Sequence, residues 1–481
     1  MWEMGGSCRS HGQFYYAISI GRVFFPILAC PLWLFVKTVH DLCLGRLINV
    51  GMLSISAFFF CQWLRKHSIS PVLSWLVTLT LFTLPTFQTQ VDLVNSFPHT
   101  VGVLASIGAG FMAWRGAQVR ESFFNRYTFL ATALTFFSMS ISTALSTFYF
   151  PVIAVPLILS SDWKDWRGRR LLHLFGPFFV AAALYLPFAK LTYTFVPFWF
   201  KIPKSTVLSW GHRVAITRNI PRKIPLFLNA FYIALNLWNI LLSYRFALVT
   251  AAVLLSGAAL GFVDLLKRAD FQGPARGRAF LKGLLILSLF PLAMLPNLTA
   301  DFYLLSYRMI SALCALTVVA LFFAIRKLCF TFLGRIGNFA VGLVFLFFAV
   351  TGIYKAQSNL RNFIVAPTQA ELKYIQSVLQ KNDLREVRRI HVIRPNPGNF
   401  LGASRNLPTC DDEFGLLTST FRQNVPGLIR CVLRESGLGT DAIRKIKISS
   451  GLYYKSGMSR PHMIVVDMKK LYNELYKNFI G

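Results

Sequence analysis

The sequence predicts an all-α polytopic membrane bundle of about ten transmembrane helices, with interfacial helices and a small C-terminal α/β domain. Of the 481 residues, 55% are hydrophobic and 14% are charged, whereas a soluble domain carries about 25% charged residues. The mean hydropathy is +0.53. Apolar runs long enough to cross a bilayer recur over residues 46–354, which excludes an ordinary soluble protein.

Polar residues bound each apolar run and give approximate limits for the membrane spans. We expect spans at 46–64, 70–87, 100–115, 127–143, 146–160, 172–195, 245–265, 281–300, 303–325 and 336–354. The stretch 225–242 carries three asparagines and a tryptophan, a composition that favours a helix lying along the outer membrane surface. Residues 21–37 contain two prolines and are expected to form a second interfacial or re-entrant segment.

The net charge of +31 comes largely from short basic loops between apolar runs. Such loops stay in the cytoplasm, so no nucleic-acid partner is expected. The loops 162–170 and 266–278 are predicted to be cytoplasmic. Counting spans from them places residues 1–45 and the tail outside, in a multi-pass membrane protein with an external C-terminal domain.

Three domains follow from this reading. Residues 1–45 form an outer interfacial segment, residues 46–355 the transmembrane domain and residues 366–481 a C-terminal α/β domain. In the tail, "VRRIHVIRP" and "HMIVVDM" alternate like strands, and a helix broken near Pro426 lies between them. Because an outer domain lies in an oxidising compartment, Cys410 and Cys431 are candidates for a disulfide.

Arg308 is the one charged residue inside the apolar stretch 303–325. An arginine cannot lose its charge, so it needs a partner near the membrane. With the hydroxyl of Tyr307 beside it, Arg308 is a candidate to clamp a lipid phosphate. The alternatives are contact with ordinary lipid headgroups or a pair with a carboxylate in the bundle.

Two outer loops add candidate binding residues. The loop 196–224 is strongly basic on the side where basic loops are disfavoured, as expected if it binds an anionic lipid; its candidate phosphate-binding residues are Lys201, Lys204, Arg213, Arg218 and Arg222. The loop 88–99 is rich in amides, which suit sugar hydroxyls; its candidates are Gln88, Gln90, Asn95 and His99. The alternative for the first loop is an error in the assigned topology, and the alternative for the second loop is a plain solvated turn.

The order of these features resembles the bacterial O-antigen glucosyltransferases of the Gtr type, within the GT-C superfamily of polytopic glycosyltransferases. The resemblance rests on "GRVFFPIL" (21–28), "LINVGMLSISAFFFCQWLRK" (47–66), "LPTFQTQVDLVNSFPHT" (84–100), "STFYFPVIAVPLIL" (146–159) and "LLSYRMISALCAL" (304–316). It implies an enzyme that takes a sugar from a polyprenyl phosphate carrier on the outer face and delivers it to a cell-envelope glycan or lipid acceptor. Basic residues on outer elements would hold the lipid phosphate.

The resemblance also implies a carboxylate base in the first outer loop. Transfer from a phosphate donor needs a carboxylate to deprotonate the acceptor hydroxyl, and Asp41 and Asp92 are the candidates. The family opens with a transmembrane helix and an acidic pair ahead of the "GR" at 21–22, and this sequence has neither. Either a first helix is missing from the sequence, or the chain is a diverged or inactive member.

No metal site is predicted from residue spacing, and no cofactor is assigned. A divalent metal remains an alternative role for the acidic stretch "CDDEFG" (410–415). The second functional class is a transporter or flippase for a lipid-linked or anionic solute, which would show internal repeats and charges at the membrane midplane. The sequence shows no repeat, and its charges lie at the ends of spans, which favours the enzyme.

Overall fold

The computed structural model describes residues 17–480 except 36–38, 93–96, 120–122, 124, 161–167, 200–215, 218, 241, 269–273, 302–305, 385, 396–417, 421–424 and 454–461. The chain divides into two compact units. The helical unit comprises Phe14–Ala29 and Leu47–Ala356. The tail unit is made mainly of Gln357–Gly481, with Cys30–Arg46 from the N-terminal part.

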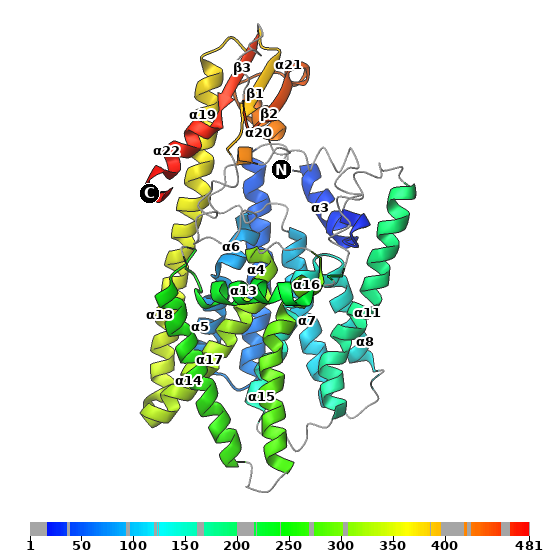
Figure 1. Ribbon diagram of the computed structural model, residues 1–481, viewed down its shortest axis with the longest axis vertical. Helices are drawn as coiled ribbons and strands as arrows, with labels where there is room; N and C mark the ends of the chain where they lie inside the picture. Colours follow the sequence, from blue (N-terminus) through cyan, green and yellow to red (C-terminus); the bar gives the residue numbers. More distant parts are fainter. Residues whose placement is uncertain are drawn as a thin grey trace. The chain divides into compact units, whose positions relative to one another are not determined.

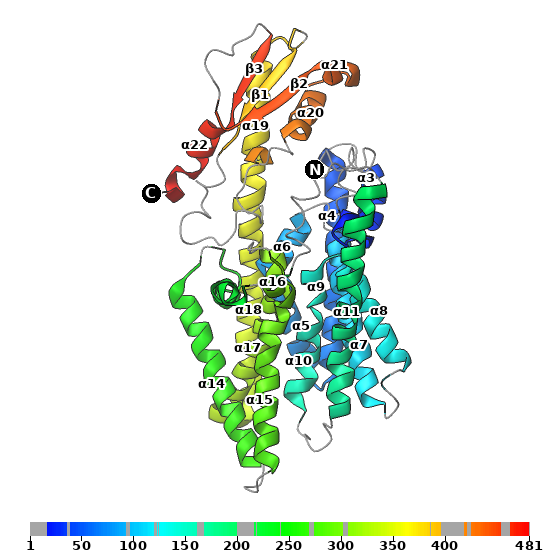
Figure 2. The ribbon, with the colours of Figure 1, turned by 45° about the vertical axis from the view of Figure 1, so that its right-hand side comes forward.

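Helices build the helical unit, and its longer helices run side by side in Figures 1 and 2. The bounds are α3 Phe24–Phe35, α4 Val39–Lys66, α5 Pro71–Phe82, α6 Pro85–Asp92, α7 Phe97–Gln118, α8 Arg126–Met139, α9 Thr143–Ser146, α10 Tyr149–Leu159, α11 Gly168–Trp199, α13 Ile224–Leu235, α14 Tyr244–Arg268, α15 Pro274–Ala293, α16 Leu295–Thr299, α17 Ser311–Leu333 and α18 Gly337–Leu360. The 3-10 turns η4 (Ile220–Lys223), η5 (Tyr307–Ile310) and η6 (Gly334–Ile336) connect some of them.

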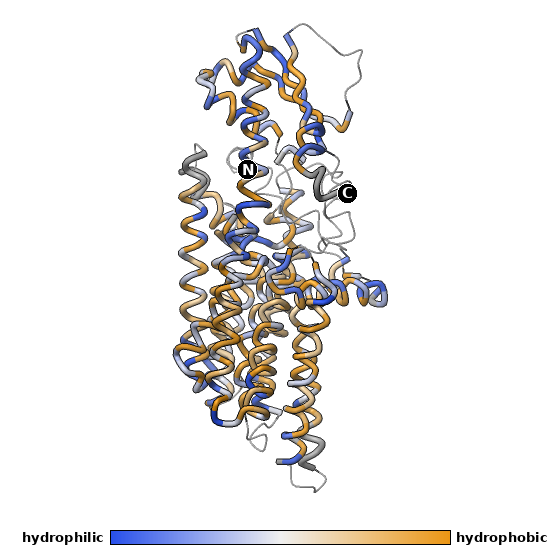
Figure 3. The backbone as a smooth tube through the Cα atoms, turned by 90° about the vertical axis from the view of Figure 1, so that its left-hand side faces the viewer, coloured by the Kyte–Doolittle hydropathy of each residue, from blue (hydrophilic) through white to orange (hydrophobic). Residues whose placement is uncertain are grey.

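Within the described part of the chain, four helices are long and apolar enough to cross a membrane, or five if the bent pair α5 and α6 counts as one span. They lie in Cys43–Lys66, Gly168–Trp199, Tyr244–Asp264 and Tyr307–Gln380. Hydrophobic residues predominate along the long helices of the helical unit in Figure 3, and large apolar side chains such as Leu184, Leu255 and Phe347 are exposed on the candidate spans. Exposed apolar faces of this kind fit lipid contact, which supports the prediction of a helical membrane protein.

Small and aromatic side chains let the helices pack closely. A Cβ atom added to Gly257 of α14 would lie 2.4 Å from the Cβ atom of Ala324 in α17, so glycine permits the close approach of these helices. On the other side of the bundle, α7 contacts α8, α10 and α11. The rings of Phe60, Phe82, Phe87 and Phe148 form a cluster in which Phe82 is half-buried and the other three are buried.

The predicted span 70–87 is not one straight helix. α5 and α6 are bent by 68° at a short break. Pro85 begins α6, and its ring nitrogen has no hydrogen to donate to a preceding carbonyl, which favours a break in the helix at this point. The Thr83 hydroxyl caps the end of α5 by donating to the Leu79 carbonyl at 2.8 Å. The continuous span was therefore wrong, and a broken helix takes its place.

The predicted span 303–325 also begins later than expected. Tyr307 to Ile310 form η5, and α17 begins only at Ser311. Arg308 therefore lies in a 3-10 turn at the very start of the candidate span Tyr307–Gln380, ahead of α17 itself. Another expectation concerns 225–242, where α13 lies across the neighbouring helices in Figure 1 and is seen end-on in Figure 2. This orientation matches that of an interfacial helix.

The tail unit contains a parallel three-stranded sheet in the order β2-β1-β3. Its strands are β1 Arg389–Ile393, β2 Lys447–Gly451 and β3 Met463–Asp467, and its helical segments are η7 Arg361–Val365, α19 Ala366–Gln380, η9 Thr418–Thr420, α20 Val425–Glu435, α21 Thr440–Lys445 and α22 Met468–Ile480. Ile390 pairs with Ile448 and Ile464 across the sheet. The small α/β domain is thus present, and its strands β1 and β3 match the two predicted strands.

Two details of the tail differ from the prediction. The strand β2 was not expected. The predicted break near Pro426 stays a prediction: Pro426 is the second residue of α20, a position where proline is tolerated, and residues 421–424 before this helix lie outside the described residues. Cys431 is a buried free thiol, so its pairing with Cys410, which lies outside the described residues, was wrong.

Candidate functional site

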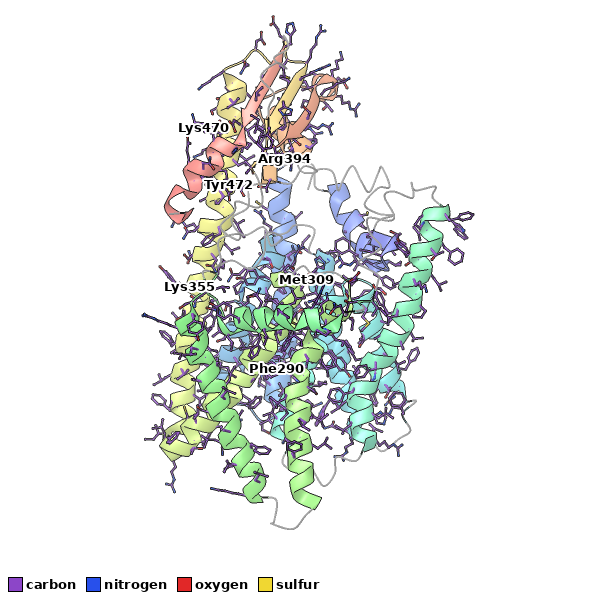
Figure 4. The ribbon with its side chains drawn as sticks, viewed as in Figure 1. Phe290, Met309, Lys355, Arg394, Lys470 and Tyr472 are labelled. Atoms are coloured by element: carbon purple, nitrogen blue, oxygen red, sulfur yellow. The ribbon has the colours of Figure 1, made fainter. Side chains whose placement is uncertain are left out.

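The η5 turn holds Arg308 at a junction of several helices. The turn contacts α6, α9 and α17, and Figure 4 marks its position by the labelled residue Met309. Two hydrogen bonds fix its backbone: the Ser311 hydroxyl donates to the Arg308 carbonyl at 2.8 Å, and the Asn297 amide donates to the Met309 carbonyl at 2.9 Å. Tyr307 is buried and Arg308 is partly exposed, so the guanidinium group is held by a rigid backbone at the edge of the core.

α6 brings polar side chains to the same junction. The Gln88 side-chain amide donates to the Thr83 carbonyl at 2.7 Å and so ties α6 to the end of α5. The backbone carbonyl of Gln90 accepts a hydrogen bond from the side-chain amide of Asn49 in α4 at 3.1 Å. Since α6 contacts η5, the predicted amide residues Gln88 and Gln90 lie on the element that packs against the Arg308 turn.

His99 and Arg22 extend the cluster. His99, in the first turn of α7, is buried, and its ring lies 5.1 Å from the ring of Phe25. The positive charges of Arg308 and Arg22 both act on His99, which places the two arginines near the same histidine. Sequence reasoning did not select Arg22, although it lies in the "GR" of the family-like motif.

Gly21 explains how Arg22 reaches this place. Gly21 has a φ of 82°, a left-handed conformation that a side chain makes unfavourable. A Cβ atom there would lie 2.7 Å from the Ala189 Cβ atom and 2.8 Å from the Tyr185 hydroxyl oxygen of α11. The glycine therefore allows the turn that leads from Ile20 to Arg22 against α11.

A second cation that sequence reasoning missed is Lys223. It is almost fully buried, and its Nζ donates to the Asn297 carbonyl at 3.3 Å. The Asn297 side chain bonds in turn to the Met309 carbonyl, which links Lys223 to the Arg308 turn. Burial lowers the pKa of Lys223, and the nearby Asp301 carboxylate acts in the opposite direction.

Apart from its first residues, which end α11, the basic loop 196–224 is described only near its C-terminal end. There Ile216 forms a bridge with Ala300, and the Thr217 amide donates to the Thr299 carbonyl at 2.7 Å. Arg222 is exposed. Lys201, Lys204, Arg213 and Arg218 lie outside the described residues. The described end of this loop packs against α16. That helix precedes the Arg308 turn in the sequence, and its residue Asn297 bonds to the Met309 carbonyl of the turn.

The two candidate carboxylates are placed only by their backbones. Asp92 is the last residue of α6, the helix that contacts η5. Asp41 lies at the start of α4 in the tail unit. Their side chains, together with Asn95 and the stretch 410–415, lie outside the described residues. Among the residues that are described, no group of three histidine, cysteine or acidic side chains is placed to hold a metal ion.

Chemically, the junction combines positive charge with neutral hydrogen-bonding groups. Arg308, Arg22 and Lys223 provide cations that favour an anion such as a phosphate. The amides on α6 favour a ligand rich in hydroxyl groups. Comparison of the chain with protein-family models, curated proteins and solved structures finds no match.

Proposed function

We propose that this chain is an integral membrane glycosyltransferase that moves a sugar from a polyprenyl-phosphate-linked donor to a glycan or lipid acceptor. The observation that carries the proposal is the contact between the Arg308 turn and α6. It brings a candidate phosphate-binding arginine next to the amides predicted to bind a sugar. A sugar linked to a phosphate needs both kinds of group within a short distance.

In the proposed reaction the cations act on the donor phosphate. Negative charge grows on the phosphate as the bond to the sugar breaks, and positioned cations stabilise that charge. Arg308 provides a planar guanidinium group with two parallel donors for phosphate oxygens. Lys223 and Arg22 add positive charge from separate segments, which strengthens the preference for an anion.

A carboxylate completes the proposed chemistry. It accepts the proton of the attacking acceptor hydroxyl, while the phosphate leaves with the electron pair of the broken bond. Asp92 is our preferred base because it ends the helix that carries the amides. Asp41 is the alternative. The proposal places the protein in the cell inner membrane, in contact with membrane lipids and with its C-terminal domain on the periplasmic side.

A second candidate function is a transporter or flippase for a lipid-linked or anionic solute. The break between α5 and α6, with its 68° bend, favours this alternative, because discontinuous helices line the binding sites of many transporters. The two functions differ in their product. A transferase forms a new glycosidic bond, whereas a flippase moves the intact lipid-linked sugar across the bilayer.

Sugar transfer by Arg308 variants tests the proposal. We expect Arg308→Lys to impair transfer and Arg308→Ala to impair it more, since lysine keeps the charge but not the two parallel donors. A hydrogen bond to a charged group contributes roughly 1.5–3 kcal/mol, so donor affinity should fall about tenfold to a hundredfold. The measurement is transfer from polyprenyl phosphate sugars to envelope glycans, normalised to folded protein.

Arg335→Ala is a matched control. Arg335 lies in η6, the 3-10 turn at the other end of α17, and is exposed. Its loss should leave transfer unchanged. Unchanged specific activity in Arg308→Ala would remove Arg308 from the mechanism. Movement of labelled lipid-linked sugar across vesicles without any transfer would favour the flippase instead.

A further inference from the structure

Two polar residues of α6 are buried without hydrogen-bond partners for their side chains. Thr86 and Gln90 are separated by one helical turn and share a face of α6. Both are 0% exposed. Within the part of the chain that the structure describes, the Thr86 hydroxyl and both polar atoms of the Gln90 amide have no hydrogen-bond partner. Buried polar side chains are paired in the great majority of cases, so this face requires an explanation.

Two other polar side chains of α6, those of Gln88 and Thr89, are satisfied locally. The Gln88 amide donates to the Thr83 carbonyl at 2.7 Å, and the Thr89 hydroxyl donates to the Thr86 carbonyl at 3.0 Å. On a further face Phe87 packs against Phe82 and Phe148. These contacts hold the helix in place without Thr86 and Gln90, so the fold itself gives no use for those two side chains.

The chemistry of the unpaired atoms indicates a type of ligand. An amide offers both a donor and an acceptor, and so does a hydroxyl group. A phosphate offers only acceptors, so it would leave the side-chain oxygen of Gln90 without a hydrogen-bond donor. A sugar ring carries neighbouring hydroxyl groups that both donate and accept, and it can satisfy Thr86 and Gln90 together.

The position of α6 fits the same ligand. The helix contacts η5, which carries Arg308, and the Gln90 backbone is held by Asn49 of α4. We propose that Thr86 and Gln90 bind hydroxyl groups of the sugar ring, and so distinguish a sugar-bearing polyprenyl phosphate from the bare polyprenyl phosphate. This inference rests on the proposed function and assigns the sugar-binding part of that site to one face of α6.

Ligand binding to the purified full-length chain in nanodiscs tests the inference. The probes are farnesyl phosphate and its glucosyl, galactosyl and mannosyl esters. The quantity of interest is the sugar gain, defined as the Kd of farnesyl phosphate divided by that of the tightest sugar ester. We expect Thr86→Val and Gln90→Leu each to reduce this gain by roughly two- to tenfold, because each removes hydrogen bonds to the sugar, and to leave farnesyl phosphate affinity unchanged.

A second readout separates this role from a structural one. Replacing an unpaired buried polar group by an apolar group of similar shape is neutral or stabilising for the free protein. The thermal unfolding midpoint should therefore stay level or rise in Thr86→Val and Gln90→Leu. Thr89→Val is the control, since it makes the same substitution on the same helix at a hydroxyl that is already bonded, and it should keep the full sugar gain.

The outcomes are distinct. A sugar gain that persists in both Thr86→Val and Gln90→Leu overturns the inference and leaves the proposed function standing. Lower midpoints with equal loss of affinity for all four probes also overturn it, because the residues would then serve the fold. If the wild-type chain binds none of the probes, the proposed function itself fails, and the inference fails with it.

Discussion

Neighbouring residues of this chain have very different surroundings. Arg222 is exposed, whereas Lys223 is buried against Asn297. The sequence presents them as two equivalent cations in a basic loop, and sequence reasoning selected Arg222. Only the packing of η4 against α16 decides which of the two reaches the core. Charge alone therefore selects a basic segment, but it cannot tell which cation of that segment is buried.

Cys431 gives a prediction of chemical reactivity. Burial and the neighbouring Glu435 carboxylate raise the pKa of its thiol to about 12, from an ordinary value of 9.0. The thiolate is the reactive form, so at pH 8 the thiolate fraction falls about a thousandfold relative to a free cysteine. We expect Cys431 to remain unmodified by iodoacetamide while the exposed Cys43 reacts, as measured by peptide mass spectrometry.

Unfolding provides the control for this labelling. In sodium dodecyl sulfate both thiols should be modified at similar rates. Rapid modification of Cys431 in the folded chain would contradict its burial on the inner face of α20 and the packing of the tail unit.

Secondary structure elements show where sequence patterns stop being informative. The strand β2 was missed because "KISSG" has a single large apolar residue, Ile448, and its side chains are exposed or half-buried. The break between α5 and α6 was missed because the apolar run continues through Leu84, so hydropathy showed no interruption there. Pro85, which begins α6, was the available sequence signal for the break.

Lys282 offers a prediction about helix ends. It lies in α15 and is buried, and its Nζ donates to the Ser160 carbonyl at 2.6 Å and to the Ile158 carbonyl at 3.3 Å. These carbonyls lie at the C-terminal end of α10, where backbone acceptors lack partners within the helix and favour a cation. We expect Lys282→Met to lower the free energy of unfolding by roughly 1–3 kcal/mol, measured by thermal unfolding in detergent.

Lys267→Met is a suitable comparison, because Lys267 is exposed on α14. Its effect should be within the error of the measurement. Equal stability of the Lys282→Met variant and the wild-type chain would contradict the capping role of Lys282.

For the chain as a whole, the sequence predicted the class of fold better than the site. A helical bundle with apolar spans and a small α/β tail followed from hydropathy and alternation, which are local patterns. The site brings together Arg22, α6, His99, Lys223 and Arg308, segments far apart along the chain. Their proximity depends on the packing of the helices. The sequence could therefore indicate some of these segments as candidates, but not that they lie together in the fold.

Photocrosslinking tests most directly whether the Arg308 turn and α6 belong to one binding site for the lipid-linked donor. The probe is a polyprenyl phosphate with a diazirine near its phosphate, applied to the full-length chain in nanodiscs and mapped by peptide mass spectrometry. We predict labelling in both Pro85–Asp92 and Tyr307–Ile310, suppressed by unlabelled undecaprenyl phosphate and weakened in Arg308→Ala. The opposite result is labelling that unlabelled undecaprenyl phosphate suppresses but that falls only on other helices, such as α14 and α15. This result would contradict the assignment of the junction as the donor site.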